Sequence, residues 1–501
     1  MTLKNVTYYL AILGFLAGTL FLSSCEKDDD EPQVDPSEVT ADAGTDIQTG
    51  INEEVTLDGS GSTTSEGTLS YLWDLMSSPN GSVARIEDAT SKRASFTPDK
   101  EGAYNIRLTV SVGGTSKSDN ITVTASSGPI ELPCSQINEE MTLDKKYEGV
   151  VYHVPCMIRV NAGLIIEPGV TVQFAQGAGF QFSDYGEREG YLKAVGTEQD
   201  SIRFTGAIKT EGAWDQLKIG SGDLRNTMKY CIVEYAGSQD GSKAAIQVDS
   251  DSKIELKNSL VRRSSGYGMF VTDKGNIKGF ANNIFTQNKS YPLHIAANKV
   301  SQLDGRGTSY TGNATDDGAN RDEIYVFSNS LYDRGYITGQ EPHVWTDPGV
   351  PFFINELLYV GKDAEGTLRI MPGCEITFGQ NFGMTVDRYN ASLQVMGTAD
   401  DKVTFRGRNG QGSWNGIYLN TNNLENTIQY AVITDGGQSK MGSQFDNPAN
   451  LSLGYNDAIT LSLDNVQINN SAGCGIVESG TVNLTTNNVT FSGNTGNDYC
   501  N

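Results

Sequence analysis

The chain has 501 residues, a formal net charge of −24 and an isoelectric point near 4.5. An acidic surface repels nucleic acid phosphates, so this charge argues against a nucleic acid partner. The sequence has three histidines with no pair at zinc-ligand spacing, and it lacks a nucleophile triad or a phosphate-binding loop. We therefore expect no metal and no cofactor.

Residues 1–25 are typical of a secretory signal peptide. The apolar stretch Tyr8–Leu22 is too short to cross a bilayer comfortably. The segment Leu22-Ser-Ser-Cys25 resembles the lipobox of bacterial lipoproteins. The resemblance implies that cleavage leaves Cys25 at the N-terminus and that its thiol carries lipid. A chance cysteine near an ordinary cleavage site is the alternative.

Residues 26–40 begin with the acidic run Glu26-Lys-Asp-Asp-Asp-Glu31, which stays solvated as a flexible tether. The run resembles the export signal behind the lipidated cysteine of surface lipoproteins of the Bacteroidota. The resemblance implies a protein anchored in outer-membrane lipid through acylated Cys25 and facing the cell exterior. A plain linker is the alternative interpretation.

Residues 41–125 contain short strand patterns separated by turns. In the clearest of them, Tyr104, Ile106, Leu108, Val110 and Val112 alternate with polar neighbours, which is typical of a half-buried strand. Several such strands in a short segment predict a β-sandwich.

Three segments of this region, Leu57-Asp-Gly-Ser-Gly-Ser62, Tyr71-Leu-Trp73 and Gly102-Ala-Tyr104, resemble a PKD domain, which is an immunoglobulin-like module. The chain departs from the family at Asp74–Gly81, where many relatives have a phenylalanine-glycine-aspartate-glycine turn. The resemblance implies a spacer or binding module without catalysis. We expect Trp73 to be the core tryptophan of the sandwich rather than a platform for a sugar.

After a linker at residues 126–133, residues 134–501 contain an internal duplication. The segment Asp223–Val233 is nearly repeated by Asn423–Ile433, and Leu164–Phe174 is repeated by Leu368–Phe378. The repeating units are roughly 20–25 residues long, which is the length of one turn of a parallel β-helix. In this fold, asparagines can stack at the same corner of successive turns.

These repeated segments resemble the right-handed parallel β-helix proteins of the pectin-lyase-like superfamily. The expected fold is therefore all-β, with copies at about 150–296 and 352–501 and a junction between them. The segment Asp322–Phe327 already reads as a strand of the second copy. A β-propeller or a run of further β-sandwiches is the structural alternative, but propeller blades would need a longer and more even period.

The cysteines lie in a chain that is routed out of the cytosol, where disulfides persist. Cys134 and Cys156 flank the first strands of the large domain and form the best candidate pair, although two buried thiols are an alternative. Cys474 with Cys500 is a second candidate pair. Cys231 and Cys374 read as core residues.

The residues give little support to catalysis. The hydrolases of this superfamily carry an Asn-Thr-Asp strand end, a paired Asp-Asp, a His-Gly and an Arg-x-Lys. The large domain has paired aspartates, such as Asp316-Asp317, but none of the other three motifs. Asp215 and Glu234 could form a carboxyl pair for glycosidic cleavage, but the second copy has Asn415 and Thr434 at these positions. The acidic segment Thr315–Glu323 lacks the spacing of a calcium loop.

The duplication separates packing residues from candidate site residues. Residues kept in both copies, such as Trp214 with Trp414 and Tyr230 with Tyr430, are expected to pack, and an exclusive site should lie where the copies differ. Seven aromatic residues could instead stack on sugars, although we expect at least half of them to pack: Tyr185, Tyr191, Tyr267, Tyr310, Tyr332, Tyr336 and Trp345.

The sequence therefore predicts a cell-surface lipoprotein that displays a rigid β-helix for binding or adhesion, with a glycan as the favoured ligand and no identified catalytic residue. A polysaccharide lyase or glycoside hydrolase is one alternative. A structural or assembly protein that docks other surface proteins is another.

Overall fold

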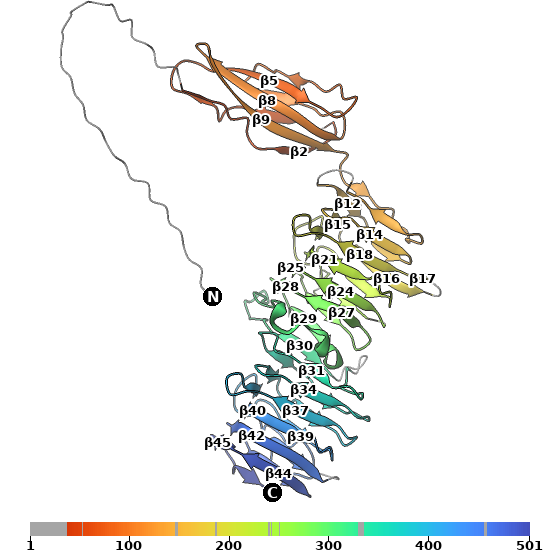
Figure 1. Cartoon of the computed structure of the whole chain (residues 1–501), viewed down its shortest axis with the longest axis vertical. Coiled ribbons are helices and arrows are strands. Elements are labelled where there is room, and N and C mark those ends of the chain that lie inside the picture. The colour runs from red at the N-terminus through yellow and green to blue at the C-terminus, as the bar shows by residue number, and fades with distance from the viewer. Residues whose placement is uncertain are drawn as a thin grey trace, which may run out of the picture. The chain divides into compact units, whose positions relative to one another are not determined.

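The computed structural model describes residues 38–52, 54–145, 149–185, 188–238, 241, 243–249, 251–328, 335–454 and 458–501. Cys25 and the acidic run behind it lie outside these residues. The regular elements of the described chain are strands apart from two short 3-10 helices, so the all-β prediction is confirmed (Figure 1). The chain divides into two compact units after Ala125. No helix among the described residues is long and apolar enough to span a membrane.

The first unit is an antiparallel β-sandwich. Trp73 is 2% exposed, and its indole nitrogen donates a hydrogen bond of 3.2 Å to the carbonyl of Ser91. Trp73 therefore lies in the core, as expected. One sheet has the order β2 (Ile47–Gly50), β9 (Thr115–Ser126), β8 (Gly102–Val112), β5 (Ser70–Ser77), and the other has the order β3 (Val55–Asp58), β7 (Arg93–Phe96), β6 (Ile86–Glu87).

The second unit is a parallel β-helix, and its first half has three sheets. The first sheet contains β10 (Ile130–Glu131), β12 (Val151–Val154), β15 (Thr171–Phe174), β19 (Ile202–Gly206), β22 (Cys231–Glu234), β25 (Leu260–Arg262) and β28 (Ile284–Thr286). The second contains β11 (Met141–Leu143), β14 (Gly163–Ile166), β18 (Tyr191–Val195), β21 (Thr227–Lys229), β24 (Lys253–Lys257) and β27 (Asn276–Ala281). The third contains β13 (Met157–Val160), β16 (Gly179–Tyr185), β20 (Leu217–Gly220), β23 (Ile246–Val248), β26 (Met269–Val271) and β29 (Leu293–Ala296).

The second half repeats this pattern. The counterparts of the first sheet are β30 (Ile324–Phe327), β32 (Phe352–Ile354), β35 (Glu375–Phe378), β38 (Val403–Gly407), the later parts of β40 (Thr427–Thr434) and β42 (Ile459–Asn469), and β45 (Thr490–Ser492). The counterparts of the second sheet are β31 (His343–Trp345), β34 (Thr367–Ile370), β37 (Ser392–Met396), the earlier parts of β40 and β42, and β44 (Val482–Asn487). The counterparts of the third are β33 (Leu358–Val360), β36 (Gly383–Val386), β39 (Gly416–Leu419), β41 (Ala449–Gly454), β43 (Cys474–Ser479) and β46 (Tyr499–Cys500).

The junction joins the two halves through a shared sheet. Strand β30, which the sequence predicts as a strand of the second copy, pairs with β29 of the first half and with β32 of the second. Its counterpart β10 belongs to the first sheet, whereas β29 belongs to the third. The second half is therefore turned by one face relative to the first. The short 3-10 helix η1 (Ala297–Gln302) lies at this junction.

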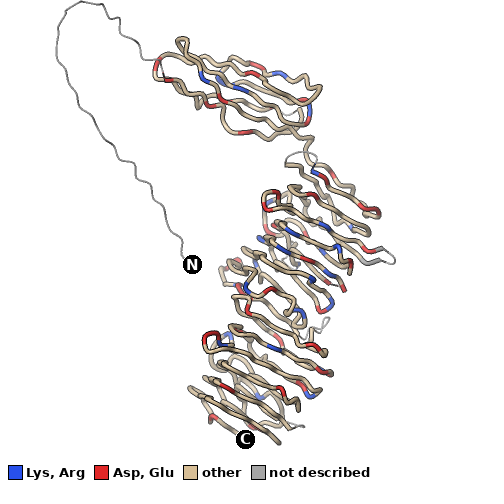
Figure 2. The backbone as a smooth tube through the Cα atoms, in the orientation of Figure 1, with Lys and Arg blue, Asp and Glu red and all other residues tan. Residues whose placement is uncertain are grey.

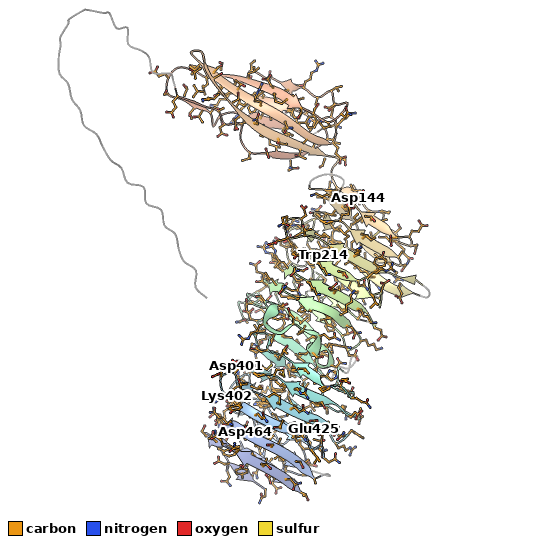
Figure 3. All side chains as sticks on the ribbon, viewed as in Figure 1. Asp144, Trp214, Asp401, Lys402, Glu425 and Asp464 are labelled. Atoms are coloured by element: carbon orange, nitrogen blue, oxygen red, sulfur yellow. A yellow bond between two sulfur atoms is a disulfide. The ribbon has the colours of Figure 1, made fainter. Side chains whose placement is uncertain are left out.

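The duplicated tryptophans occupy duplicated places in the core. Trp214 stacks on Phe174 with ring centroids 4.1 Å apart, and Trp414 stacks on Phe378 at 4.6 Å. Both tryptophans are 0% exposed. Their indole nitrogens donate hydrogen bonds to the carbonyls of residues 234 and 434, at 2.9 and 2.7 Å. Each half thus repeats the same stacked and hydrogen-bonded pair. Figure 3 labels Trp214 of the first half.

The predicted asparagine ladders are present at corners of the helix. The side-chain amide of Asn282 donates to the Oδ1 of Asn258 at 3.1 Å, and that of Asn488 donates to the Oδ1 of Asn465 at 2.6 Å. All four residues have positive φ values between 50° and 55°. Asparagine tolerates this left-handed conformation better than most residues, so the ladder also fixes the direction in which the chain turns.

Two other pairs of residues that are identical in both copies do not lie in the core. Tyr230 and Tyr430 occupy the same corner with φ values of 50° and 44°, and both are half-buried. Leu224 and Leu424 are 67% and 78% exposed. The expectation that kept residues pack therefore holds for the tryptophans and is wrong for these leucines.

We predict that Trp414→Ala lowers the free energy of unfolding by roughly 3–5 kcal/mol, because it leaves a cavity beside Phe378. Trp414→Phe should cost clearly less, since it keeps most of the stacked surface. Chemical denaturation followed by circular dichroism would measure both changes. Equal effects of the two variants would show that stacking at this position contributes little.

Candidate functional site

The cysteines predicted to pair are joined by disulfides. Cys134 is bonded to Cys156 with their Cα atoms 5.8 Å apart, and Cys474 is bonded to Cys500 at 6.2 Å. Cys231 and Cys374 are buried free thiols. Burial raises the pKa of both thiols, for Cys374 to about 12, which makes them inert packing residues.

Glu234, the first candidate catalytic carboxyl, is held in an ion-pair network. Its carboxylate accepts hydrogen bonds from Arg203 at 2.8 Å, from Arg262 at 2.7 and 2.9 Å and from Thr205 at 3.1 Å. Burial raises the pKa of Glu234, but the hydrogen bonds from Arg262 and Arg203 outweigh burial and hold it below the ordinary value. A carboxyl that stays ionised in this way is a poor general acid.

The other candidate carboxyls also have partners. Asp215 accepts from the ammonium group of Lys243 at 2.5 Å. The four acidic residues of the junction contact four different partners, which are Lys289 for Asp316, Thr315 for Asp317, Asn313 for Asp322 and Arg408 for Glu323. No group of three His, Cys, Asp or Glu side chains that could hold a metal occurs in the part of the chain that the structure describes.

Most of the candidate aromatic residues that can be assessed have little free surface. Tyr191, Tyr310 and Trp345 are 4%, 1% and 0% exposed. Tyr267 and Tyr336 are half-buried. Tyr332 and the side chain of Tyr185 lie outside the described part of the chain. These positions therefore do not form an exposed aromatic stripe.

A different feature stands out on the second sheet of the first half. Because side chains alternate along a strand, the outward positions of β18, β21, β24 and β27, with the turn before β21, form one surface, which we call the basic face. Figure 2 marks the lysines and arginines along the backbone in blue. Asp223 and Glu255 are its acidic members. Its six basic members are Lys193, Arg225, Lys229, Lys253, Lys257 and Lys278.

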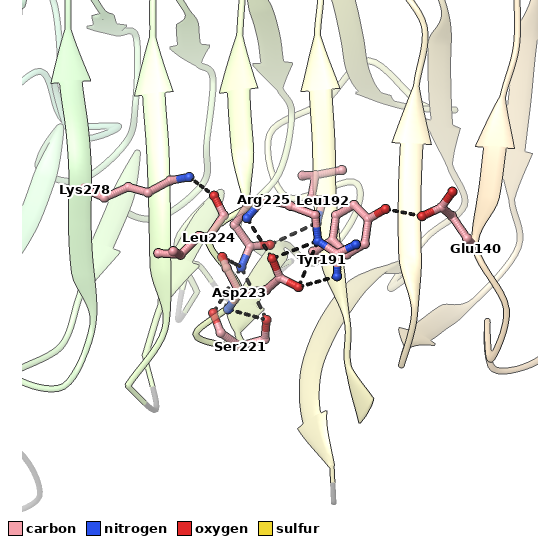
Figure 4. A network of polar contacts seen from close by, with 9 residues as sticks. Glu140, Tyr191, Leu192, Ser221, Asp223, Leu224, Arg225 and Lys278 are labelled. Carbon is pink, nitrogen blue, oxygen red and sulfur yellow. Dashed lines mark hydrogen bonds and ion pairs between the residues drawn. The ribbon is translucent and has the colours of Figure 1, made fainter. Parts of the chain in front are cut away.

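One edge of the basic face is fixed by a stacked arginine (Figure 4). The guanidinium carbon of Arg225 lies 3.7 Å from the ring centre of Tyr191, and Asp223 holds the same guanidinium with hydrogen bonds of 2.6 to 3.1 Å. The hydroxyl of Tyr191 donates to Glu140. Residue 163 must be glycine because a Cβ there would lie 2.4 Å from the Tyr191 ring.

The centre of the basic face gathers three lysines around one carboxylate. Glu255 contacts Lys229 at 3.0 Å and Lys257 at 2.8 Å. Strand β27 has a bulge opposite Ile254 and Glu255 that leaves Lys278 as an extra residue. Bulges re-aim side chains, and here the Lys278 ammonium group reaches the carbonyl of Leu224.

The lysines are close enough to influence one another while remaining accessible. Partial burial lowers the pKa of Lys278, Glu255 raises it, and Lys229 and Lys257 lower it further. Lys278 is exposed, and the side chains of Lys229 and Lys257 keep 33% and 37% of their surface. An anionic group can therefore approach all three ammonium groups.

The second half has no basic residue at the corresponding positions. The strand register matches Lys193, Lys229, Lys253 and Lys257 with Gln394, Gln429, Thr460 and Asp464, and the duplicated turn matches Arg225 with Glu425. The pairing of β42 with β44 has no bulge, so Lys278 has no counterpart. The basic face thus belongs to one copy alone, which is where the duplication predicts an exclusive site.

Sequence reasoning missed this face because its members are spread from residue 193 to residue 278. They form no charged run, and the chain as a whole is acidic. A signal was nevertheless available in the aligned repeats, where the substitutions Lys193 to Gln394 and Lys229 to Gln429 change charge inside otherwise matching strands.

Comparisons with known proteins identify the first unit. A family model described as a PKD domain matches residues 43–125, so this part of the chain is a PKD domain and the predicted resemblance is confirmed. A solved structure of the PKD domain from KIAA 1837 protein is 36% identical, covers 18% of this chain and 89% of its own, and has a TM-score of 0.15.

The β-helix has less informative matches. The solved Agl-KA catalytic domain is 12% identical, with coverage of 92% of this chain and 86% of its own, and its TM-score is 0.21. A similarity at this level assigns no activity to the chain. No curated protein matches it.

We predict that Glu234→Ala lowers the free energy of unfolding by up to about 3 kcal/mol, because it leaves two arginines without their shared partner. This is the lower end of the range for a broken buried ion pair, since the side chains of Arg203 and Arg262 are 38% and 30% exposed. Asp215→Asn, the matched control, should cost no more than about 1 kcal/mol, because the side chain of its partner Lys243 is 39% exposed and solvent screens the pair.

The effect of Glu234→Ala should also depend on pH. Because the folded pKa of Glu234 is lowered, its stabilisation is present above the ordinary glutamate pKa of about 4.3 and is lost as the pH falls through the folded value. Urea unfolding at neutral and acidic pH measures this dependence. A constant difference between wild type and variant would contradict the assigned ion-pair role.

Proposed function

We propose that the protein is a cell-surface lipoprotein, anchored in the outer membrane through Cys25, whose β-helix binds acidic polysaccharides on the basic face. The observation that carries the proposal is the restriction of this face to the first half. Its six basic members outnumber its two acidic members, Asp223 and Glu255, in a chain whose net charge is −24. The duplicated strands have similar inward residues in both halves, but their outward residues differ in charge. This difference favours a role for the outward charge in binding.

The arrangement of the lysines fits an extended ligand. Lys229 and Lys257 are register partners on adjacent strands, and adjacent strands lie about 4.8 Å apart. A sugar chain that crosses the rungs would place successive carboxylate or sulfate groups beside successive strands. Exposed Lys193, Lys253 and Lys278 extend the positive surface on either side of this pair.

The partners of the candidate carboxyls support binding without cleavage. Hydrolysis of a glycosidic bond uses two carboxyls with different protonation states. Glu234 is held ionised by two arginines, and Asp215 is paired with Lys243. The PKD domain and the expected tether would hold the β-helix away from the membrane surface.

We expect the purified full-length chain to bind carboxylated or sulfated polysaccharides with an affinity that falls as salt rises, because screening weakens exposed charge pairs. The triple variant Lys193→Gln, Lys229→Gln, Lys278→Gln should lose at least about tenfold in affinity, which is about 1.4 kcal/mol. The first two changes install the residues of the second half. Biolayer interferometry at two salt concentrations measures both effects.

A matched control separates this face from overall charge. Lys92, Lys117 and Lys440 are exposed lysines outside the basic face, and changing all three to Gln alters the net charge by the same amount. This control should bind like wild type. Equal loss in both triple variants, or no binding of wild type to any acidic polysaccharide, would refute the proposal. Release of unsaturated ends or reducing ends would instead favour the enzyme alternative.

A further inference from the structure

A hollow lined mainly by polar residues lies at a corner of the second half. Its volume is about 340 Å³, which is within the range of roughly 300–1,000 Å³ of small-molecule sites. Side chains from the turn before β38 and from successive rungs below it line the hollow. The lining residues are Ala399, Lys402, Tyr430, Asn465, Gln467, Asn488 and Thr490.

The chemistry of this lining matches an uncharged sugar. A tyrosine ring offers an apolar surface against which the C–H groups of a sugar can pack, and amides with a hydroxyl can donate to and accept from sugar hydroxyls. The side chains of Lys402, Gln467 and Thr490 form no hydrogen bond with another residue in the described ranges. Their polar groups are therefore available to a ligand.

The asparagine ladder supplies a fixed wall to the hollow. Asn488 donates to the Oδ1 of Asn465 at 2.6 Å, and Asn465 donates to Asp464 at 3.0 Å. These bonds set the direction of both amide groups before a ligand arrives. Rigid positioning of this kind lowers the entropic cost of binding. Lys402, by contrast, is an exposed side chain at the rim (Figure 3).

The corresponding corner of the first half is less polar. In the second half, Gln467 is the register partner of Val432 on one side and of Thr490 on the other. In the first half, Leu260 is the register partner of Ile232 and of Ile284 in the same way. Leu260 and Ile284 thus stand where the second half has Gln467 and Thr490. The alignment of the repeats also places Ser201 opposite Lys402. The tyrosine and the asparagines are common to both corners, so the polar additions distinguish this one.

We propose that this corner is a second saccharide subsite, which takes an uncharged pyranose unit between Tyr430 and the side chains of Gln467, Asn488, Thr490 and Lys402. The subsite goes beyond the basic face, because it lies in the other half and recognises hydroxyl groups rather than carboxylates or sulfates. Its one basic residue is Lys402, and the carboxylate of Asp464 accepts a hydrogen bond from Asn465 of the same lining, so the corner lacks the clustered positive charge of the basic face.

The repeats provide a conservative test. The double variant Gln467→Leu, Thr490→Ile installs the first-half residues at positions whose register already accepts them. Saturation-transfer NMR of the full-length chain with a panel of uncharged oligosaccharides should detect binding of at least one member by wild type. The double variant should weaken that binding at least about tenfold. Leu260→Gln, Ile284→Thr in the first half is the matched control and should leave it unchanged.

Lys402→Ser gives a second variant in case the double variant does not fold, because residue 402 is exposed and the first half has a serine there. It should also weaken binding of the uncharged sugar. Neither variant should alter binding to acidic polysaccharides, so failure of this subsite is distinguishable from failure of the basic face. Absence of binding by wild type at millimolar concentrations, or unchanged binding by both variants, would overturn the inference.

Discussion

The structure of the large unit depends on the register with which each rung pairs to the next. Parallel pairing places equivalent residues of successive rungs directly above one another, about 4.8 Å apart. Inside the helix this alignment places Gly206 over Phe174 and Gly407 over Phe378, and the absence of a side chain at these glycines leaves room for Trp214 and Trp414 to stack on the phenylalanines. Outside the helix the same alignment brings Lys229 beside Lys257. Core packing and surface charge are therefore two results of one geometric constraint.

This constraint explains how the two halves can share a fold and differ in chemistry. Inward positions must fill the same space in both copies, and they keep apolar residues such as Leu192 and Leu393, which are both fully buried. Outward positions contact solvent, so Lys193 can be exchanged for Gln394 without loss of the core. The basic face and the polar corner both consist of such exchanges, one in each half. A β-helix of this design can carry surfaces of different chemistry on one scaffold.

The sequence predicted the features that depend on repetition. Three features could be predicted because they recur at nearly constant spacing. They are the strand segments, the asparagines at the corners of the helix and the tryptophans present in both copies. Exposure of Leu224 and Leu424 was not predictable, since a kept leucine normally indicates burial. The basic face was missed because its lysines meet only through the strand register, and the β27 bulge that frees Lys278 has no sequence signature. The rotation of the second half by one face relative to the first was also not predictable from the sequence, because it depends on the pairing of β30 with β29.

The central claim is that one face of the first half, and not its copy, meets an acidic polysaccharide. Hydrogen–deuterium exchange of the full-length chain with and without such a polymer tests it most directly. Binding to the basic face should slow exchange in the peptides that contain β18, β21, β24 and β27, and should leave β37, β40 and β42 unchanged. Equal protection of both halves, or protection confined to the second half, would contradict the account.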